Sequence, residues 1–160
     1  MSGKTAKAAR APAVRYRPVR EADLDALVEL ENACFETDRL TRRNFVWMIR
    51  KAHAWFEVAE VDGALAAYCL VLFHRGTSLA RLYSIAVSSK RRGLGIARSL
   101  LARAESEAVE HDCVYMRLEV HPDNASAIAI YEQAGYYRFG LLRKYYDDQS
   151  DALRVLPRRQ

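Results

Sequence analysis

The stretch KRRGLGIARSLL, residues 90–101, joins a basic segment with two glycines to an apolar run with helical spacing. Residues 78–87 before it interleave apolar and polar side chains as a strand does, whereas residues 95–110 repeat apolar side chains every three or four positions. A further strand is predicted at 114–120. Strand, glycine loop, helix and strand make a crossover unit, so we expect the two strands to lie parallel and adjacent.

The two glycines stand where the predicted helix begins, and the first backbone N–H groups of a helix lack intrahelical partners. Because Gly93 and Gly95 have no Cβ, an anionic oxygen can approach these donors, and the helix dipole adds partial positive charge. Such a site suits a phosphate or pyrophosphate. The dinucleotide pattern GxGxxG and the P-loop pattern GxxxxGK[ST] are both missing, and a tight strand-to-helix connection without a ligand remains an alternative for the turn.

The other segments predict an α+β domain. Strands are expected at 14–17, 55–61, 64–73, 136–146 and 151–156, and helices from Glu21, from a Thr41 N-cap, and from Asn124 to a Gly135 C-cap. Asp62-Gly63 is a strong hairpin signal between two of these strands. We therefore predict a mixed, mostly antiparallel sheet of six to seven strands with a parallel central pair, flanked by about four helices.

Charge and length restrict the class of protein. The 160 residues fit one domain, and the net charge is +5. Five of the cations lie in terminal segments that contain no acid, namely Lys4, Lys7, Arg10, Arg158 and Arg159. Residues 15–157 are therefore neutral overall. A nucleic-acid-binding domain carries its basic excess on the folded part, so nucleic acid is not the expected partner, although Arg91 and Arg92 could form a small basic patch. We expect residues 1–13 to be a disordered basic tail and residues 14–157 to form a single domain.

Targeting, cysteine and histidine patterns are uninformative or negative. The sequence contains no apolar run near the roughly 18 residues of a membrane span and no signal-peptide core, so a cytoplasmic protein without membrane contact is expected. Three cysteines without a CxxC pair and four histidines without HExxH spacing predict neither a disulfide framework nor a metal site. Cys113 as a nucleophile remains a minor alternative because no paired histidine is evident.

Two motifs carry a resemblance to a known family. Arg-x-x-Gly-x-Ala at residues 92–97 precedes LEVHPDNASAIAIYEQAGYYRFG at residues 118–140. In this order and separation they resemble the GNAT acyltransferase superfamily, which binds acetyl-CoA on an R/Q-x-x-G-x-G/A loop. The second motif is similar to the LEVRxxNxxAIxLYxxxGF signature of RimI-like N-terminal alanine acetyltransferases of ribosomal proteins. Predicted elements match over residues 14–156, so the resemblance implies a GNAT-like fold and an N-acetyltransferase domain at 14–157.

The resemblance also implies site residues. Glu119 would be the general base and Tyr131 the general acid, although an exposed strand carboxylate and a core tyrosine are the simpler alternatives. Backbone groups near Ile85 would hold the pantetheine arm, and the glycine loop would hold the pyrophosphate. The implied acetyl-CoA-binding residues are Ile85, Ala86, Val87, Arg92, Gly93, Leu94, Gly95, Ile96, Ala97, Arg98, Asn124 and Tyr131, with no metal.

The implied reaction is direct acetyl transfer from acetyl-CoA to a primary amine in a ternary complex. A protein α-amine is the expected acceptor, possible examples being ribosomal-protein termini, because its pKa of about 7.7–8 lies well below the 10.4 of lysine. The acceptor groove is expected from residues 34–41 and 143–151, with polar groups from Glu36, Tyr145, Tyr146, Asp147 and Asp148. Lysine or small-molecule acetylation and a non-catalytic acyl-CoA-binding regulatory module remain alternatives, and both a monomer and a homodimer remain open.

Overall fold

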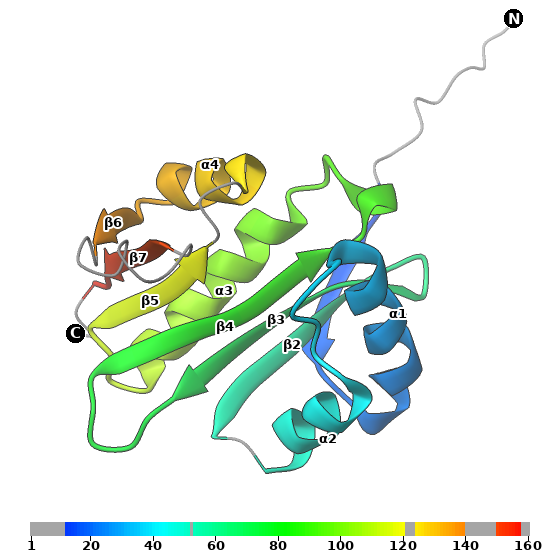
Figure 1. Cartoon of the computed structure of the whole chain (residues 1–160), viewed down its shortest axis with the longest axis horizontal. Helices are drawn as coiled ribbons and strands as arrows, with labels where there is room; N and C mark the ends of the chain where they lie inside the picture. Colours follow the sequence, from blue (N-terminus) through cyan, green and yellow to red (C-terminus); the bar gives the residue numbers. More distant parts are fainter. Residues whose placement is uncertain (1–11, 52, 121–123, 140–149, 158–160) are drawn as a thin grey trace, which may run out of the picture.

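The computed structural model describes residues 12–51, 53–120, 124–139 and 150–157. Figure 1 shows the arrangement of its helices and strands. The elements in chain order are β1 (Val14–Pro18), the 3-10 helix η1 (Glu21–Asp23), α1 (Leu24–Cys34), α2 (Arg42–Arg50), β2 (Ala54–Val61), β3 (Ala64–Phe73), β4 (Leu79–Val87), the 3-10 helix η2 (Ser89–Arg91), α3 (Ile96–Glu110), β5 (Tyr115–Val120), α4 (Ala125–Gln133), β6 (Tyr137–Phe139) and β7 (Ser150–Val155).

One seven-stranded sheet has the order β1-β2-β3-β4-β5-β7-β6. Among the strands that the structure describes, β4 and β5 pair in parallel and every other neighbouring pair is antiparallel. The predicted mixed sheet with a parallel central pair is therefore confirmed. Of the last predicted strand at 136–146, the structure describes β6 only to Phe139, and residues 140–146 lie outside the described part.

Helices cover the sheet on both sides, α1 and α2 on one face and α3 and α4 on the other (Figure 1). Strand β3 shows why both layers are needed: Tyr68 and Leu70 pack under α1 and α2, while Cys69 and Val71 pack on the α3 side. All four side chains are fully buried. A strand buried on both faces reads as a continuous apolar run, which explains the sequence ALAAYCLVLF.

A β-bulge changes the direction of β4 in the middle of the sheet. Leu70 of β3 pairs with Ser84, but the next residue, Val71, pairs with Leu82, so Tyr83 is an extra residue in β4. The parallel pairing with β5 also ends at Leu82, which lies opposite Leu118. Beyond this pair the two strands diverge (Figure 1), and the sheet opens between their carboxyl ends.

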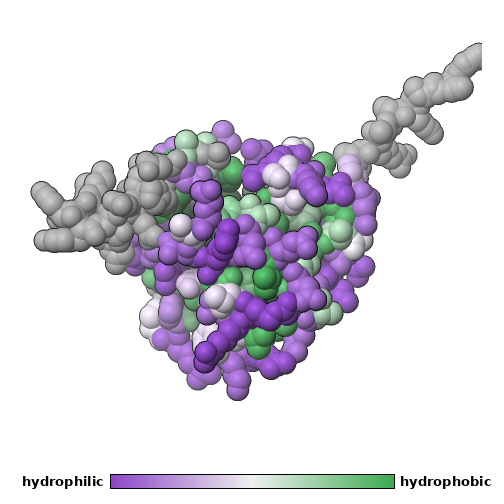
Figure 2. Space-filling view, turned by 45° about the vertical axis from the view of Figure 1, so that its right-hand side comes forward, coloured by the Kyte–Doolittle hydropathy of each residue, from purple (hydrophilic) through white to green (hydrophobic). Residues whose placement is uncertain are grey.

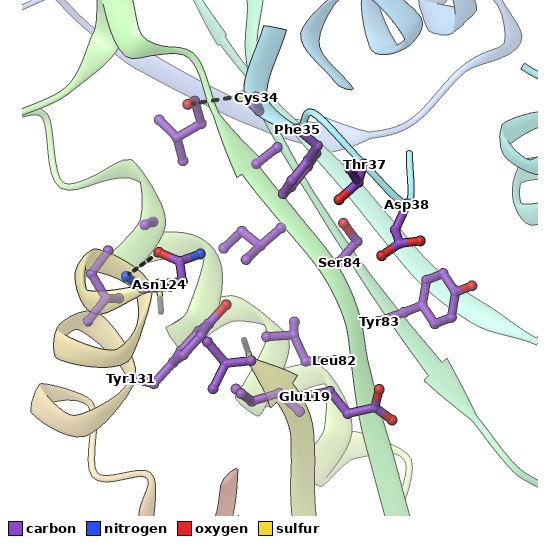
Figure 3. A pocket seen from close by; sticks show the side chains of 18 of the residues that line it. Cys34, Phe35, Thr37, Asp38, Leu82, Tyr83, Ser84, Glu119, Asn124 and Tyr131 are labelled. Atoms are coloured by element: carbon purple, nitrogen blue, oxygen red, sulfur yellow. Dashed lines mark hydrogen bonds between the residues drawn. The ribbon is translucent and has the colours of Figure 1, made fainter. Parts of the chain in front are cut away.

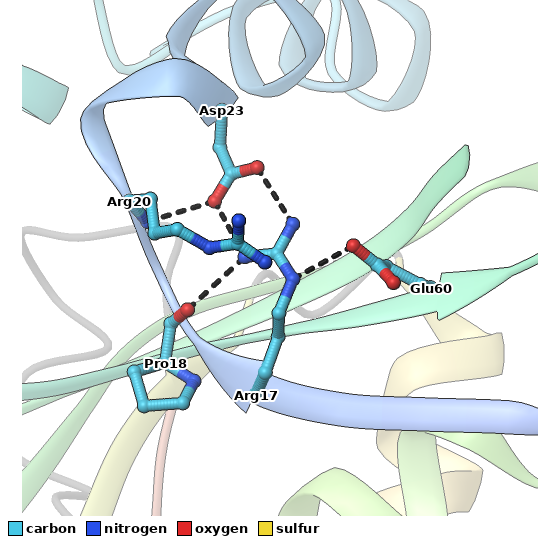
Figure 4. Close-up of polar contacts among 5 residues, drawn as sticks. All are labelled: Arg17, Pro18, Arg20, Asp23 and Glu60. Atoms are coloured by element: carbon cyan, nitrogen blue, oxygen red, sulfur yellow. Dashed lines mark hydrogen bonds and ion pairs between the residues drawn. The ribbon is translucent and has the colours of Figure 1, made fainter. Parts of the chain in front are cut away.

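An ion-pair cluster joins β1 to η1 and to β2 (Figure 4). Arg17 donates hydrogen bonds to both oxygens of Asp23, at 2.8 and 2.9 Å, and a third to Glu60 of β2 at 2.7 Å. The backbone N–H of Arg20 also donates to Asp23, at 2.8 Å. The segment around Asp23 is therefore a 3-10 turn, and the α-helix that we predicted from Glu21 begins only at Leu24.

Within the described ranges, none of the helices is long and apolar enough to cross a bilayer. The predicted tail at residues 1–13 stays a prediction, because residues 1–11 are not described.

Candidate active site

A pocket of about 530 Å³ lies where β4 and β5 diverge. On the face drawn in Figure 2, hydrophobic side chains gather near the centre and hydrophilic ones surround them. Figure 3 shows the pocket from close by. Its walls come from the end of α1 and the loop after it, from both diverging strands, from the start of α3 and from α4. The lining residues are Cys34, Phe35, Thr37, Asp38, Leu82, Tyr83, Ser84, Ile85, Ala86, Val87, Arg92, Ala97, Leu118, Glu119, Val120, Asn124, Ala127, Ile130 and Tyr131.

The N-terminus of α3 has the geometry of a potential anion-binding site. Gly93 and Gly95 have φ of 82° and 71°, a left-handed conformation that glycine adopts without strain, and a Cβ on either would meet no atom within 4 Å. Gly95 caps the helix without a side-chain hydrogen bond, and the first turn contains no acid. The first intrahelical bond runs from the Ser99 N–H to the Gly95 carbonyl at 3.0 Å. Helix geometry therefore leaves the N–H groups of residues 96–98 free for a phosphate oxygen.

Of the predicted loop residues, Arg92 and Ala97 line the pocket, whereas Gly93, Leu94, Gly95, Ile96 and Arg98 do not. Several side chains of this loop have other contacts. Ile96 is buried in the core on the α3 side, and Leu94 packs against the same core. Arg98 donates to Gln133 of α4 at 3.5 Å, and Arg91 pairs with Asp62 at 3.3 Å. Arg92 does line the pocket and can contribute its charge there.

The pocket-facing edge of β4 is the second potential binding surface for a cofactor. Because pairing with β5 stops at Leu82, residues 83–87 present a strand edge that β5 does not occupy. Ile85 and Val87 pack on the α3-side core, whereas Ala86 is buried under α1. The side chains of these residues thus pack in the core, and their backbone borders the pocket. A strand edge of this kind can bind an extended, amide-containing chain by adding it as a further strand.

Glu119 is the carboxylate on the β5 side of the pocket. It faces away from Leu118 and Val120, which are buried on the α3 side. Its side chain is 30% exposed and forms an ion pair with Arg81 at 2.9 Å. The Arg81 guanidinium also lies over the Tyr83 ring, 5.2 Å from its centroid. The structure therefore places the predicted base at the pocket, with an arginine partner that the sequence motif did not indicate.

Tyr131 of α4 points into the pocket (Figure 3). Only 9% of the residue is exposed, and its ring makes an edge contact with Tyr136 at 5.9 Å between centroids. None of the described residues forms a hydrogen bond with its hydroxyl. Burial raises the pKa of Tyr131 well above the usual value for a phenol, so the hydroxyl stays protonated. Tyr131 is thus both a core residue and a hydrogen-bond donor available to a ligand.

Asn124 caps the helix that carries Tyr131. Its Oδ1 accepts the Ala127 N–H at 3.2 Å, as the sequence predicted for an N-cap. The residue also lines the pocket, and its amide nitrogen lies on the pocket side in Figure 3. One side chain can therefore cap α4 and still donate to a ligand.

The α1 side of the pocket is where the acceptor groove was predicted. From the predicted segment 34–41, Cys34, Phe35, Thr37 and Asp38 line the pocket, whereas Glu36 does not. Of the other predicted acceptor residues, Tyr145, Tyr146, Asp147 and Asp148 lie outside the described residues.

Two lining residues, Tyr83 and Ser84, were missed because we read residues 78–87 as a regular strand. In RLYSIAV the apolar step from Leu82 to Ile85 is three residues instead of two. That break is the signal of the β-bulge.

Metal-ligating side chains do not cluster in the part of the chain that the structure describes: no group of three or more His, Cys, Asp or Glu residues could hold an ion there.

The comparisons with known proteins agree with this geometry. Residues 24–136 match the acetyltransferase (GNAT) family, so the chain belongs to the GNAT acetyltransferases. The chain is therefore an N-acetyltransferase, and a relative with the same activity in its name supports this conclusion. That relative, an N-alpha-acetyltransferase of Sulfurisphaera tokodaii, is 31% identical over 92% of this chain and 94% of its own length.

Solved structures support the fold. The ribosomal-protein-S18-alanine N-acetyltransferase from Escherichia coli superimposes with a TM-score of 0.75 at 22% identity, over 92% of this chain and 96% of that one. The PaiA N-acetyltransferase from Thermoplasma acidophilum, in complex with coenzyme A, has a TM-score of 0.77 at 15% identity, over 89% and 99%. At these identities the likeness concerns the fold alone.

Proposed function

We propose that this protein transfers an acetyl group from acetyl-CoA to the α-amine of a protein or peptide N-terminus, without a covalent enzyme intermediate. The observation that carries the proposal is the pocket between the diverging strands β4 and β5. It brings together the start of α3, which has no acid in its first turn, an open strand edge, a carboxylate and a protonated phenol.

The cofactor half of the pocket suits the parts of acetyl-CoA in order. The N–H groups of residues 96–98 bind the pyrophosphate, and Arg92 adds charge. The edge of β4 at residues 85–87 binds the amides of the pantetheine arm as a short added strand, assisted by Asn124. The thioester then lies toward Tyr131 and Glu119. The coenzyme A complex of the PaiA structure, which shares this fold, supports the assignment.

The chemistry needs one base and one donor. Glu119 takes a proton from the attacking amine, directly or through water, as the nitrogen adds to the thioester carbonyl. A backbone N–H at the edge of β4 hydrogen-bonds the oxygen that gains charge. When the C–S bond breaks, Tyr131 donates a hydrogen bond to the departing thiolate. Because the pKa of Tyr131 is raised above that of a thiol, we expect hydrogen bonding rather than complete proton transfer.

Two features favour an α-amine as the acceptor. The carboxylate of Asp38, in the loop after α1, and that of Glu119, on β5, both line the pocket and attract a cationic chain end (Figure 3). An α-amine with a pKa of about 7.7–8 is partly neutral at pH 7.5, so it requires less of the base than lysine does. The N-alpha-acetyltransferase relative supports the same choice.

Calorimetry followed by initial-velocity kinetics tests the proposal. Acetyl-CoA should bind to the enzyme alone, and thiol release should require a peptide with a free N-terminus. Double-reciprocal plots at several peptide concentrations should intersect, as a ternary complex requires. Parallel lines would instead indicate a covalent acetyl-enzyme, with Cys34 the cysteine to replace first because it lines the pocket.

A further inference from the structure

A hydrogen-bonded chain runs from the pocket into the core under α1. The Ser84 Oγ lies 2.6 Å from the Tyr68 hydroxyl, and that hydroxyl lies 2.6 Å from Oε1 of Glu31. The other carboxylate oxygen of Glu31 accepts the Leu40 N–H at 2.8 Å. The chain thus links the β4 bulge, β3, α1 and the loop between α1 and α2.

The donors in this chain can be assigned. A carboxylate only accepts, so the Tyr68 hydroxyl donates to Glu31. Burial and the charge of Glu31 raise the pKa of Tyr68, which keeps this proton in place. Having used its single proton, Tyr68 can only accept from Ser84. The Ser84 hydroxyl proton therefore points away from the pocket, and its lone pairs remain for a ligand.

Glu31 is a costly residue for a core. It is 2% exposed, and no ion pair among the described residues includes it. A buried carboxylate held only by neutral donors costs far more than an apolar side chain of similar size. Holding Leu40 and Tyr68 would not require a charge. A negative charge does, however, polarise a chain of hydroxyl groups toward a cation at its other end.

The position of Ser84 shows where such a cation would bind. Ser84 adjoins the extra residue of the bulge and lines the pocket together with Thr37 and Asp38. Figure 3 places its oxygen on the side of these loop residues. We propose that Ser84 accepts a hydrogen bond from the acceptor amine, with Tyr68 and Glu31 as positioning residues that orient and polarise its hydroxyl.

This inference rests on the proposed function and deepens it, because it assigns the recognition of the amine to a group distinct from the base. When the ammonium has lost one proton to solvent, its two remaining N–H groups donate to Ser84 and Glu119, and the nitrogen lone pair is left for the thioester carbonyl. A permanently charged quaternary amine lacks an N–H and would not be bound there.

Ser84→Ala and Tyr68→Phe test the chain, singly and together. Ser84→Ala removes the acceptor but leaves Glu31 bonded to Tyr68 and Leu40. Tyr68→Phe leaves Ser84 free to rotate its proton into the pocket. Each should lower kcat/KM for a free-N-terminus peptide about tenfold or more, with the Kd for acetyl-CoA unchanged. The double variant should be no worse than the more impaired single variant, because the residues act as one unit.

Tyr136→Phe is the matched control. It removes a similar tyrosine–carboxylate hydrogen bond, to Glu105 at 3.0 Å on the other face of the sheet. It should reduce stability without changing KM for the peptide. If Ser84→Ala and Tyr68→Phe lower the melting temperature but leave kcat/KM for the peptide within about twofold, the chain is only structural and the inference is wrong. If the wild-type enzyme acetylates no peptide although it binds acetyl-CoA, both the inference and the proposed acceptor are wrong.

Discussion

Leu82 of β4 and Leu118 of β5 are the last residues paired across the parallel step of the sheet, and both are buried on the α3 side. Immediately beyond them, the bulge at Tyr83 turns β4 away and the next residue of β5 is Glu119. Three features therefore begin directly after this pair of leucines: the opening of the sheet, the free edge of β4 and the candidate base Glu119. In open sheets, ligands commonly bind in the crevice beyond the carboxyl ends of neighbouring parallel strands.

The glycine loop gives the first prediction. Gly95→Ala places a Cβ at a residue with φ of 71°, which strains the backbone and moves the N–H groups of the first helical turn. We expect the Kd for acetyl-CoA, measured by calorimetry, to rise about tenfold, the effect of losing a hydrogen bond to a charged group. Gly76→Ala is the control, since Gly76 has φ of 75° and equally open surroundings in a distant turn. Equal loss of affinity in both variants would show that general strain, not phosphate binding, is responsible.

Glu119→Gln tests the base. The amide keeps the size of the side chain but cannot take a proton, so kcat should fall on the order of 10² to 10⁴ while the Kd for acetyl-CoA is retained. Glu107→Gln removes a similarly exposed carboxylate from α3 and should have no effect on kcat. A full kcat in Glu119→Gln, measured by thiol release with a working peptide, would exclude Glu119 as the base.

Tyr131→Phe should lower kcat more than it raises KM for acetyl-CoA, because the hydroxyl contacts the thiolate only as it leaves. The raised pKa of Tyr131 also predicts the pH profile. The Tyr131 hydroxyl keeps its proton at any pH below its pKa. Because that pKa is raised, the hydroxyl loses its proton only at a higher pH than an ordinary phenol does. Activity should therefore increase as the amine deprotonates and show no decline up to pH 10 from Tyr131. Tyr115→Phe, at an exposed position, should match the wild type.

Asp23 provides a stability prediction. Its hydrogen bonds from Arg17 lower the pKa of Asp23. Because the pKa of Asp23 is lower in the folded than in the unfolded state, the ionised carboxylate stabilises the fold at a pH above the unfolded pKa of about 3.9. This stabilisation is lost as the pH falls through the pKa of the folded state. Asp23→Asn should thus cost about 3 kcal/mol at pH 7 in urea unfolding, and the difference from the wild type should shrink below pH 4. Glu21→Gln, in an exposed pair with Arg50, should cause no measurable change. An Asp23→Asn cost that is the same at both pH values would contradict the assignment.

Much of the fold followed from local patterns. Asp62 and Gly63 both have positive φ, 54° and 78°, as a two-residue hairpin turn requires, and Thr41 caps α2 as its position predicted. The parallel contact of β4 with β5 followed from the order strand, helix, strand. These features depend on neighbours in the sequence or on the handedness of the connection, so they can be read from one chain.

Long-range features could not be read in this way. The pairing of Arg81 with Glu119 depends on the register between two strands 38 positions apart. The link from Glu31 to Ser84 needs three segments to meet, and no local period indicates that a carboxylate in α1 is buried. The β-bulge was visible in principle as an irregular apolar step, yet its consequence, the pocket, appears only when β5 is in place.

Thiol release from acetyl-CoA with two matched peptides tests the central claim most directly. One peptide has a free N-terminus and no lysine, and the other has a blocked N-terminus and one internal lysine. The account predicts that CoA is released only with the first peptide, and that mass spectrometry finds one acetyl group on its α-amine. Release with the blocked peptide at an equal or higher rate would contradict the account and make lysine the acceptor.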